Sequence, residues 1–175
     1  KLKNAIHSNP DAAIVVAPEI KQAKITKKLE NNGIFMLSPN KKAVKVSGDK
    51  WKTFKILGKE LPMPRTWKGK APTFEKPLIA KPRDGTGCKN CKVTNSTIPF
   101  NDNLIFQEII KGTHASCCLI TDKNGYSTVL SVNKQIISSD GGKIEYNGSE
   151  IPIKKTMLEK FTNFAEKIGR KIGLK

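Results

Sequence analysis

A lysine closely followed by glycines is the combination in this sequence that best suits phosphate chemistry. Lys81 stands at the end of an apolar run and precedes the turn 84–87, which reads Asp-Gly-Thr-Gly. Glycines allow the backbone N–H groups of a turn to approach phosphate oxygens without a clash from Cβ. The lysine ammonium group would supply the matching positive charge. A glycine turn after a strand is usually only a turn, so this pattern is weak evidence when taken alone.

Two further positions could belong to the same site. Lys50 stands at the start of a short segment with helical spacing, where a solvated surface charge is the common alternative. Gln107 and Glu108 lie side by side within the predicted strand 104–110. Burying an unpaired carboxylate is costly, so Glu108 should have a hydrogen-bonding partner. The alternative is an edge strand from which this side chain faces water.

The composition indicates a globular protein with a large positive charge. Of the 175 residues 37% are hydrophobic, and 32 basic against 15 acidic residues give a formal net charge of +17. The lysines are spread along the chain and aromatic residues make up only 6%, so nucleic acid is a less favoured partner than a polyphosphate. A lysine-rich surface of the kind found in thermophiles explains the charge about as well.

The sequence predicts a cytoplasmic protein with reduced cysteines. No stretch approaches the roughly 18 consecutive apolar residues of a membrane span, and no signal-peptide core follows the N-terminus. Free thiols are therefore the default for Cys88, Cys91, Cys117 and Cys118. The Cys88–Cys91 spacing also suits a disulfide or half of a zinc site. The adjacent pair would be a poor chelator, because neighbouring residues on a strand point to opposite faces.

The first part of the chain predicts the end of an open α/β domain. The apolar run 12–17 indicates a buried parallel strand, and 34–37 indicates a second strand. Between them, residues 21–32 have helical spacing that ends at Gly33. Strand, helix and strand form the unit of an open α/β sheet. Since no earlier strand or phosphate-type loop precedes this unit, we expect the chain to begin inside a domain.

The remainder predicts one short helix, a series of strands and a final helix. Asp49 is a suitable N-cap for a helix whose buried stripe includes Trp51 and Leu57. Pro62 and Pro64 prevent this helix from continuing. An Asn-Gly pair predicts a hairpin turn. The predicted strands are 77–82, 104–110, 116–120, 127–137 and 143–146, with turns at 122–125, 140–142 and 147–148 and an amphipathic helix over 152–172.

In this order the segments resemble the ATP-grasp superfamily. An Asp-Lys helix start at 49–50 is followed by a proline-bearing segment and by a strand that ends in Ala-Lys-Pro before a glycine loop. A strand reading Gln-Glu-Ile-Ile and a serine-bearing strand come next. The resemblance covers roughly residues 11–150.

The resemblance implies an α/β (α+β) protein with an incomplete ATP-grasp fold behind the tail of a Rossmann-like domain. We expect that tail over residues 1–45, the N-terminal lobe of the grasp over 46–110 and the start of its C-terminal lobe over 111–175. The Glu-x-Asn cluster that binds magnesium in the family has no equivalent here, and metal ligands are expected beyond Lys175. The chain is therefore expected to be a fragment of a longer protein.

The resemblance also implies roles for individual residues. Lys50 and Lys81 would contact the ATP phosphates beneath a mobile loop that contains Gly85, Thr86 and Gly87. Gln107, Glu108 and Ile110 would form the hinge against adenine. His114 would contact the ribose, and Asn133 and Gln135 would orient the substrate. The histidine could take the place of a carboxylate of the family, but a lone histidine is more often merely exposed at the surface. The last two could instead satisfy polar groups of a sheet.

The implied function is ligation of a small-molecule carboxylate to an amine through an acyl phosphate, with ATP and magnesium as cofactors. Within the family, the chain looks most like archaeal ligases that join glutamate to tyramine. Two other classes stay open: a non-catalytic nucleotide-binding module and a basic nucleic-acid-binding protein. The protein could form a homo-oligomer.

Overall fold

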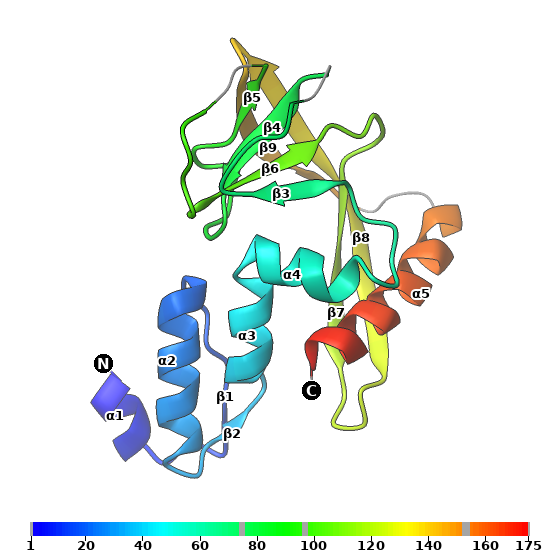
Figure 1. Ribbon diagram of the computed structural model, residues 1–175. Coiled ribbons are helices and arrows are strands. Elements are labelled where there is room, and N and C mark those ends of the chain that lie inside the picture. Colours follow the sequence, from blue (N-terminus) through cyan, green and yellow to red (C-terminus); the bar gives the residue numbers. More distant parts are fainter. Residues whose placement is uncertain (1, 74–75, 96–97, 152–154, 175) are drawn as a thin grey trace.

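The structure, a computed structural model, describes residues 2–73, 76–95, 98–151 and 155–174. Helices and a small parallel sheet form the N-terminal part, and a larger antiparallel sheet with one long helix forms the remainder (Figure 1). The predicted mixed α/β class is confirmed. No helix within the described ranges is long and apolar enough to cross a membrane.

The N-terminal part contains the predicted strand–helix–strand unit. β1 (Ala12–Ala13) pairs in parallel with β2 (Phe35–Met36), and α2 (Glu19–Glu30) connects them. Two further helices, α1 (Leu2–His7) and α3 (Lys41–Ser47), were not predicted. Both are short, and α3 lacks the length over which a periodic pattern can be recognised.

The prediction of a fully buried strand over 12–17 is wrong. Val15 is buried and packs against Leu29 of α2, whereas Ile14 is 67% exposed and Val16 is 93% exposed. A continuous apolar run is buried on both sides only when both faces of its sheet are covered. Here the buried core lies on one side, where residues of α1 and α2 pack.

Asp49 begins α4 (Lys50–Leu57), as predicted. Its carboxylate accepts hydrogen bonds from the amides of Trp51 at 3.0 Å and Lys52 at 3.2 Å, which have no partner within the first turn of a helix. At the other end, Leu57 is buried against Ile172 of α5 (Lys155–Ile172). The cap and this contact fix both ends of α4.

The larger sheet has seven strands in the order β3-β6-β4-β5-β9-β8-β7, and all neighbouring strands are antiparallel. In chain order the strands are β3 (Thr66–Lys68), β4 (Leu78–Pro82), β5 (Lys92–Thr94), β6 (Leu104–Glu108), β7 (Ala115–Thr121), β8 (Ser127–Asp140) and β9 (Lys143–Glu150). Phe106 on β6 is fully buried and packs with Leu78 and Ala80 of β4. This cluster is the core beneath the candidate site.

Three strands differ from the prediction. β3 and β5 were not predicted, because three-residue strands are too short to show a periodic pattern. β9 continues through Asn147 and Gly148, so the turn predicted there is wrong. The register of β8 against β9 shifts between Gln135 and Ile137. This irregularity lets β9 pass the glycine without reversing direction.

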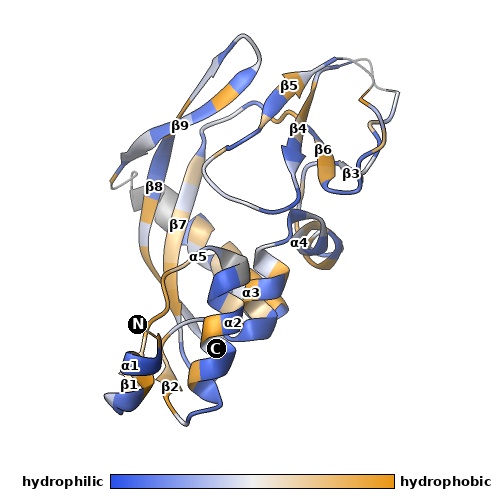
Figure 2. Ribbon diagram, turned by 90° about the vertical axis from the view of Figure 1, so that its left-hand side faces the viewer, coloured by the Kyte–Doolittle hydropathy of each residue, from blue (hydrophilic) through white to orange (hydrophobic). Residues whose placement is uncertain are grey.

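β7 and β8 form the hairpin that the Asn-Gly pair predicted. Asp122 Oδ1 accepts hydrogen bonds from the amides of Asn124 and Tyr126, both at 2.9 Å, and so stabilises the turn. Apolar residues recur along both strands (Figure 2). The predicted C-terminal helix is present as α5, and a Cβ added at its Gly169 would lie only 2.8 Å from Ser127 Oγ on β8. α5 therefore passes very close to the hairpin.

Asp49→Ala should lower the free energy of unfolding by about 0.5–2 kcal/mol, the usual effect of losing an N-cap. Asp49→Asn keeps an oxygen that can accept the two amide hydrogen bonds but loses the ion pair with Arg83 at 2.7 Å. Chemical denaturation of both variants would measure the two contributions. Equal losses in the two variants would show that the ion pair, and not the cap, provides the stability.

Candidate functional site

The glycine loop between β4 and β5 has a backbone that requires glycine. Gly85 and Gly87 have φ values of +82° and +66°, in the left-handed region that other residues rarely adopt. A Cβ added at either glycine would meet nothing within 4 Å. The backbone conformation, and not crowding, therefore selects glycine. Cys88 and Asn90 share this conformation, with φ values of +57° and +60°.

Arg83 holds the start of the glycine loop against α4. Its Nη2 lies 2.7 Å from Asp49 Oδ2, and its Nη1 donates to the carbonyl of Asp102 at 3.1 Å. Burial alone would raise the pKa of Asp49, but the hydrogen bonds and charge of Arg83 and the helix amides outweigh it and lower that pKa. The ion pair joins the helix start to the loop.

Lys50 makes a second connection between α4 and the glycine loop. Its amide donates to the carbonyl of Arg83 at 2.8 Å. Its Nζ donates to the carbonyls of Asp84 at 3.0 Å and Gly85 at 2.8 Å. An ammonium group has three N–H donors, so these contacts leave one donor without a partner among the described residues.

Lys81 lies partly buried on β4 and points toward β6. Its Nζ donates to Gln107 Oε1 at 2.6 Å, and Gln107 Nε2 donates to Thr66 Oγ1 at 2.9 Å. Burial lowers the pKa of Lys81; the neighbouring Cys91 opposes this shift, and the positive charge of Lys50 adds to it. Lys50 and Lys81, far apart in the sequence, are thus close enough to interact electrostatically.

Glu108 has the hydrogen-bonding partner that its position in a strand predicts. Its two carboxylate oxygens accept from Arg65, one from the amide at 2.7 Å and one from Nε at 2.8 Å. The edge-strand alternative is wrong, because β6 lies between β3 and β4. The Glu108 amide donates to the carbonyl of Arg65 at 3.0 Å, which occupies the donor that the hinge would offer to adenine.

The contacts of the other predicted positions, as far as the structure describes them, are with residues other than the two lysines. β6 ends at Glu108, so the predicted strand is too long, and Ile110 is 60% exposed. His114 is exposed, and its carbonyl accepts a hydrogen bond from the amide of Gln135 at 2.8 Å. Asn133 lies opposite Ser116 in the β7–β8 ladder. Its Oδ1 is buried without a hydrogen-bond partner in the described part of the chain.

A cleft of about 970 Å³ lies between the glycine loop and the helices α2 and α3. Gly85 and Thr86 line it, but Lys50 and Lys81 do not. The basic residues that do line the cleft were not predicted from the sequence; they are Lys24, Lys41, Lys45, Arg83 and Lys89. The spacing of Lys41 and Lys45 would have placed both on one side of a helix, had α3 been predicted.

The four cysteines are free thiols. Burial raises the pKa of Cys91, and the neighbouring Cys88 raises it further. Burial likewise raises the pKa of Cys117. No group of three or more His, Cys, Asp or Glu side chains able to hold a metal ion occurs among the residues that the structure describes. Nothing in this part of the chain matches the requirements of a zinc site.

Comparison with known proteins decides the family. A family model described as an ATP-grasp domain matches residues 47–175. The chain belongs to the ATP-grasp family. Two curated relatives are named tyramine–L-glutamate ligase, from Methanocaldococcus fervens and Methanocaldococcus jannaschii. Each is 30% identical, over 90% and 95% of this chain, respectively. The chain spans about half the length of these relatives, 48% and 49%.

Solved structures agree with the ATP-grasp fold. A structure from Archaeoglobus fulgidus assigned to the ATP-grasp superfamily has a TM-score of 0.77 and 26% identity, and the match covers 97% of this chain and 52% of that one. D-alanine–D-alanine ligase from Bacillus anthracis has a TM-score of 0.70 and 16% identity, over 99% of this chain and 66% of the ligase. A biotin carboxylase domain from Hydrogenobacter thermophilus, solved with MgADP, has a TM-score of 0.73 and 14% identity, covering 99% of this chain and 45% of that one.

Glu108→Gln should remove a pH-dependent part of the stability. The amide and side-chain hydrogen bonds of Arg65 lower the pKa of Glu108, so the folded state binds its proton less tightly than the unfolded state. The stabilisation is therefore complete above the unfolded pKa of about 4.3 and is lost as the pH falls through the lower folded pKa. Urea denaturation from pH 7 to pH 3 should show the two proteins converging at acidic pH. A constant difference across this range would contradict the prediction.

Proposed function

We propose that the protein is an ATP-dependent carboxylate–amine ligase that acts through an acyl phosphate. The observation that supports this proposal is that Lys50 donates from its Nζ to the glycine loop, while Lys81, on the strand that leads into this loop, lies near enough for the charge of Lys50 to help lower its pKa. Two ammonium groups within electrostatic range repel each other, so the arrangement suits a ligand with several negative charges, such as a triphosphate.

In this proposal Lys50 and Lys81 bind the ATP phosphates, and Gly85, Thr86 and Gly87 cover them. Lys81 now donates to Gln107 and Lys50 to loop carbonyls. ATP would replace these neutral acceptors with phosphate oxygens, which form stronger, charge-assisted hydrogen bonds. The exposed side of the glycine loop gives the phosphates access without moving the core.

The reaction would proceed in two balanced steps. A substrate carboxylate oxygen attacks the γ-phosphorus of ATP, and ADP leaves with the electrons of the broken P–O bond. The amine nitrogen then attacks the acyl carbon, inorganic phosphate leaves, and the nitrogen loses a proton. The lysines would stabilise the negative charge that develops on the transferred phosphoryl group, so catalysis would depend mainly on positioning and electrostatics.

Magnesium is part of the proposal for the complete enzyme, because a related fold was solved with MgADP. The described residues contain no cluster suited to the ion, so we assign no magnesium ligand to this chain and derive no step through the metal. The names of the curated relatives suggest glutamate as the acid and tyramine as the amine. Small-molecule substrates, a cytoplasmic location and a homo-oligomer are also part of the proposal.

The remaining roles predicted from the sequence are also part of the proposal. The hinge formed by Gln107, Glu108 and Ile110 would hold adenine, with the backbone at Ile110 facing the ring edge because the Glu108 amide already donates to Arg65. His114 would lie near the ribose and Asn133 or Gln135 near the substrate. The buried, unpaired Oδ1 of Asn133 supports a polar ligand near this part of β8. The division into a preceding domain (1–45) and two grasp lobes (46–110 and 111–175) stays a prediction.

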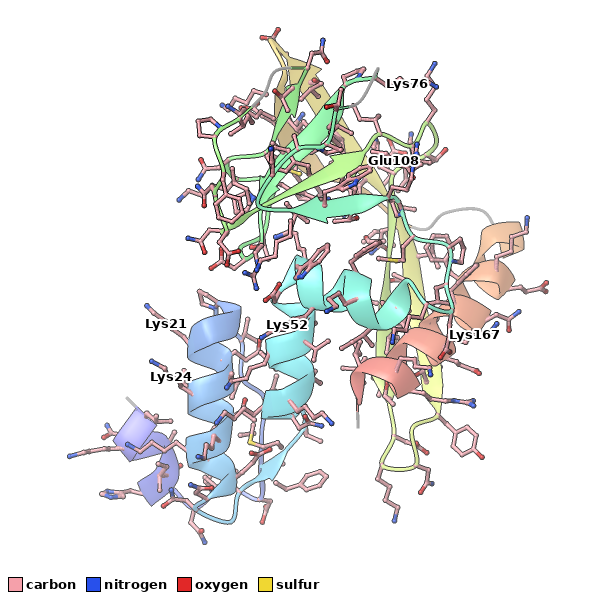
Figure 3. The ribbon with its side chains drawn as sticks, viewed as in Figure 1. Lys21, Lys24, Lys52, Lys76, Glu108 and Lys167 are labelled. Atoms are coloured by element: carbon pink, nitrogen blue, oxygen red, sulfur yellow. The ribbon has the colours of Figure 1, made fainter. Side chains whose placement is uncertain are left out.

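Lys81→Met should weaken the binding of Mg-ATP at least about tenfold, because a hydrogen bond to a charged group contributes about 1.5–3 kcal/mol. Methionine keeps an unbranched apolar side chain in the partly buried position. Lys76→Met is the matched control, since Lys76 is exposed just before β4 (Figure 3). Titration calorimetry would measure both affinities. Equal affinities of the two variants, or no binding of Mg-ATP by the unaltered protein, would rule out the proposed phosphate site.

The acyl phosphate can be tested by chemical trapping. With glutamate and Mg-ATP present, hydroxylamine should take the place of the amine and give a hydroxamate, which is measured as its coloured iron complex. We expect the rate to fall at least about tenfold in Lys81→Met, because the phosphoryl group loses a positive charge in the transition state. ADP release without any hydroxamate would contradict an acyl phosphate on this acid.

A further inference from the structure

The cleft beside the glycine loop has an unusual charge distribution. Five basic residues and two acidic ones line it. One acid–base pair is internally neutralised, because Arg83 and Asp49 lie 2.7 Å apart. Apart from this pair, the described lining residues include one acidic side chain, Asp84, and four basic ones: Lys24, Lys41, Lys45 and Lys89. The lining of the described part of the cleft therefore has a clear excess of positive charge.

The lysines on α2 and α3 are also crowded. Lys41 and Lys45 lie one turn apart on α3, and Lys27 approaches Lys41 from α2. The positive charge of Lys27 is the largest cause of the lowered pKa of Lys41, and Lys45 is the second. Glu30 opposes this shift but is the last of the contributing causes. Like charges at this spacing destabilise the free protein, and an anion between them would relieve the repulsion.

The cleft has the dimensions of a small-molecule site. Its volume of about 970 Å³ is at the upper end of the range of roughly 300–1,000 Å³ that is typical of ligand pockets. Gly85 and Thr86 form one side, and the lysines of α2 and α3 form the other. Lys24 of α2 is one of these lining residues, and its side chain extends outward from α2 (Figure 3). A ligand held here would extend from the loop that we assign to the phosphates toward the lysines of the cleft. These residues, which we call the lysine cluster, are Lys24, Lys41, Lys45 and Lys89.

We propose that this cleft binds the acid substrate, and that this acid is a glutamate extended by further acidic groups, so that it carries at least two carboxylates in addition to the one that is activated. Free glutamate has only one additional carboxylate and would bind less tightly. This inference rests on the proposed ligase function, because the glycine loop must place the γ-phosphate beside the reacting carboxylate. The activated carboxylate lies at Gly85 and Thr86. The additional carboxylates lie between Lys41, Lys45 and Lys89, where each can accept charge-assisted hydrogen bonds.

The charge of the cleft is what distinguishes this substrate class from simpler acids. A monocarboxylate would use its only charge at the glycine loop and leave the lysine cluster without a counter-ion. An acid with several carboxylates, such as an amino acid extended by further acidic residues, would neutralise the cluster along its length. Its binding should weaken with salt, because Lys24, Lys45 and Lys89 are exposed.

Calorimetric titration of the protein at low ionic strength tests this assignment with tricarballylate, a tricarboxylate. We expect it to bind at least about tenfold more tightly than butyrate, a monocarboxylate, because two further ion pairs form. The double variant Lys41→Gln/Lys45→Gln should lose at least about tenfold in tricarballylate affinity. The double variant Lys42→Gln/Lys55→Gln removes the same charge from exposed positions that do not line the cleft, and it should keep the affinity within about threefold.

Two results would overturn the assignment. Equal weakening by the two double variants would mean that only the overall positive charge attracts the anion. Inorganic phosphate binding as tightly as tricarballylate would mean that the cleft holds any small anion. Mg-ATP binding, measured on the same variants, separates this inference from the proposed function. If Mg-ATP binds but the tricarboxylate does not, only the proposed substrate class is wrong. If the unaltered protein does not bind Mg-ATP, the ligase proposal itself is wrong.

Discussion

The ion pair between Asp49 and Arg83 is the interaction on which the candidate site depends. Asp49 begins α4 and so fixes the position of Lys50, while Arg83 begins the loop that follows Lys81. The pair therefore holds two lysines near each other although their charges repel. Both members are largely shielded from water, with side-chain exposures of 16% and 22%, which limits screening by salt. Without this attraction, the like charges would favour separation of α4 from the loop.

The second constraint on the site is the polar network beneath it. Lys81 is partly buried, and its pKa is lowered because burial disfavours the charged form. Gln107 Oε1 accepts a hydrogen bond from the ammonium group, and Gln107 Nε2 donates one to the hydroxyl of Thr66, which is buried. The chain of hydrogen bonds runs across β4, β6 and β3, so the lysine is oriented by three strands of the sheet. In the proposed site, a phosphate must compete with Gln107 for this ammonium group.

Sequence reasoning succeeded where a local signal has a direct physical cause. The N-cap at Asp49, the Asn-Gly hairpin and the need of Glu108 for a partner each follow from one hydrogen-bonding requirement. It failed where neighbours in space decide the outcome. The Asn147–Gly148 pair stays within β9 because the ladder with β8 continues on both sides of it, at Tyr146 and Ser149. The exposure of Ile14 and Val16 depends on which side of the segment after β1 is covered by helices. The lysine cleft was missed for the same reason, since its walls come from separate segments of the chain.

The length of β8 has a mechanical consequence. Its first part, up to Lys134, pairs with β7, and its later part, from Lys134 onward, pairs with β9. The strand thus serves two different partners in succession, and its ladder is irregular just after the changeover, between Gln135 and Ile137. The hairpin packed on α5 could move relative to the strands that carry the glycine loop only if β8 bent or the single pairing of β5 with β9, Lys92 opposite Lys143, were broken. Because neighbouring ladder pairs reinforce one another, the changeover at Lys134 and this one-pair junction are the two weakest points in the sheet between hairpin and loop.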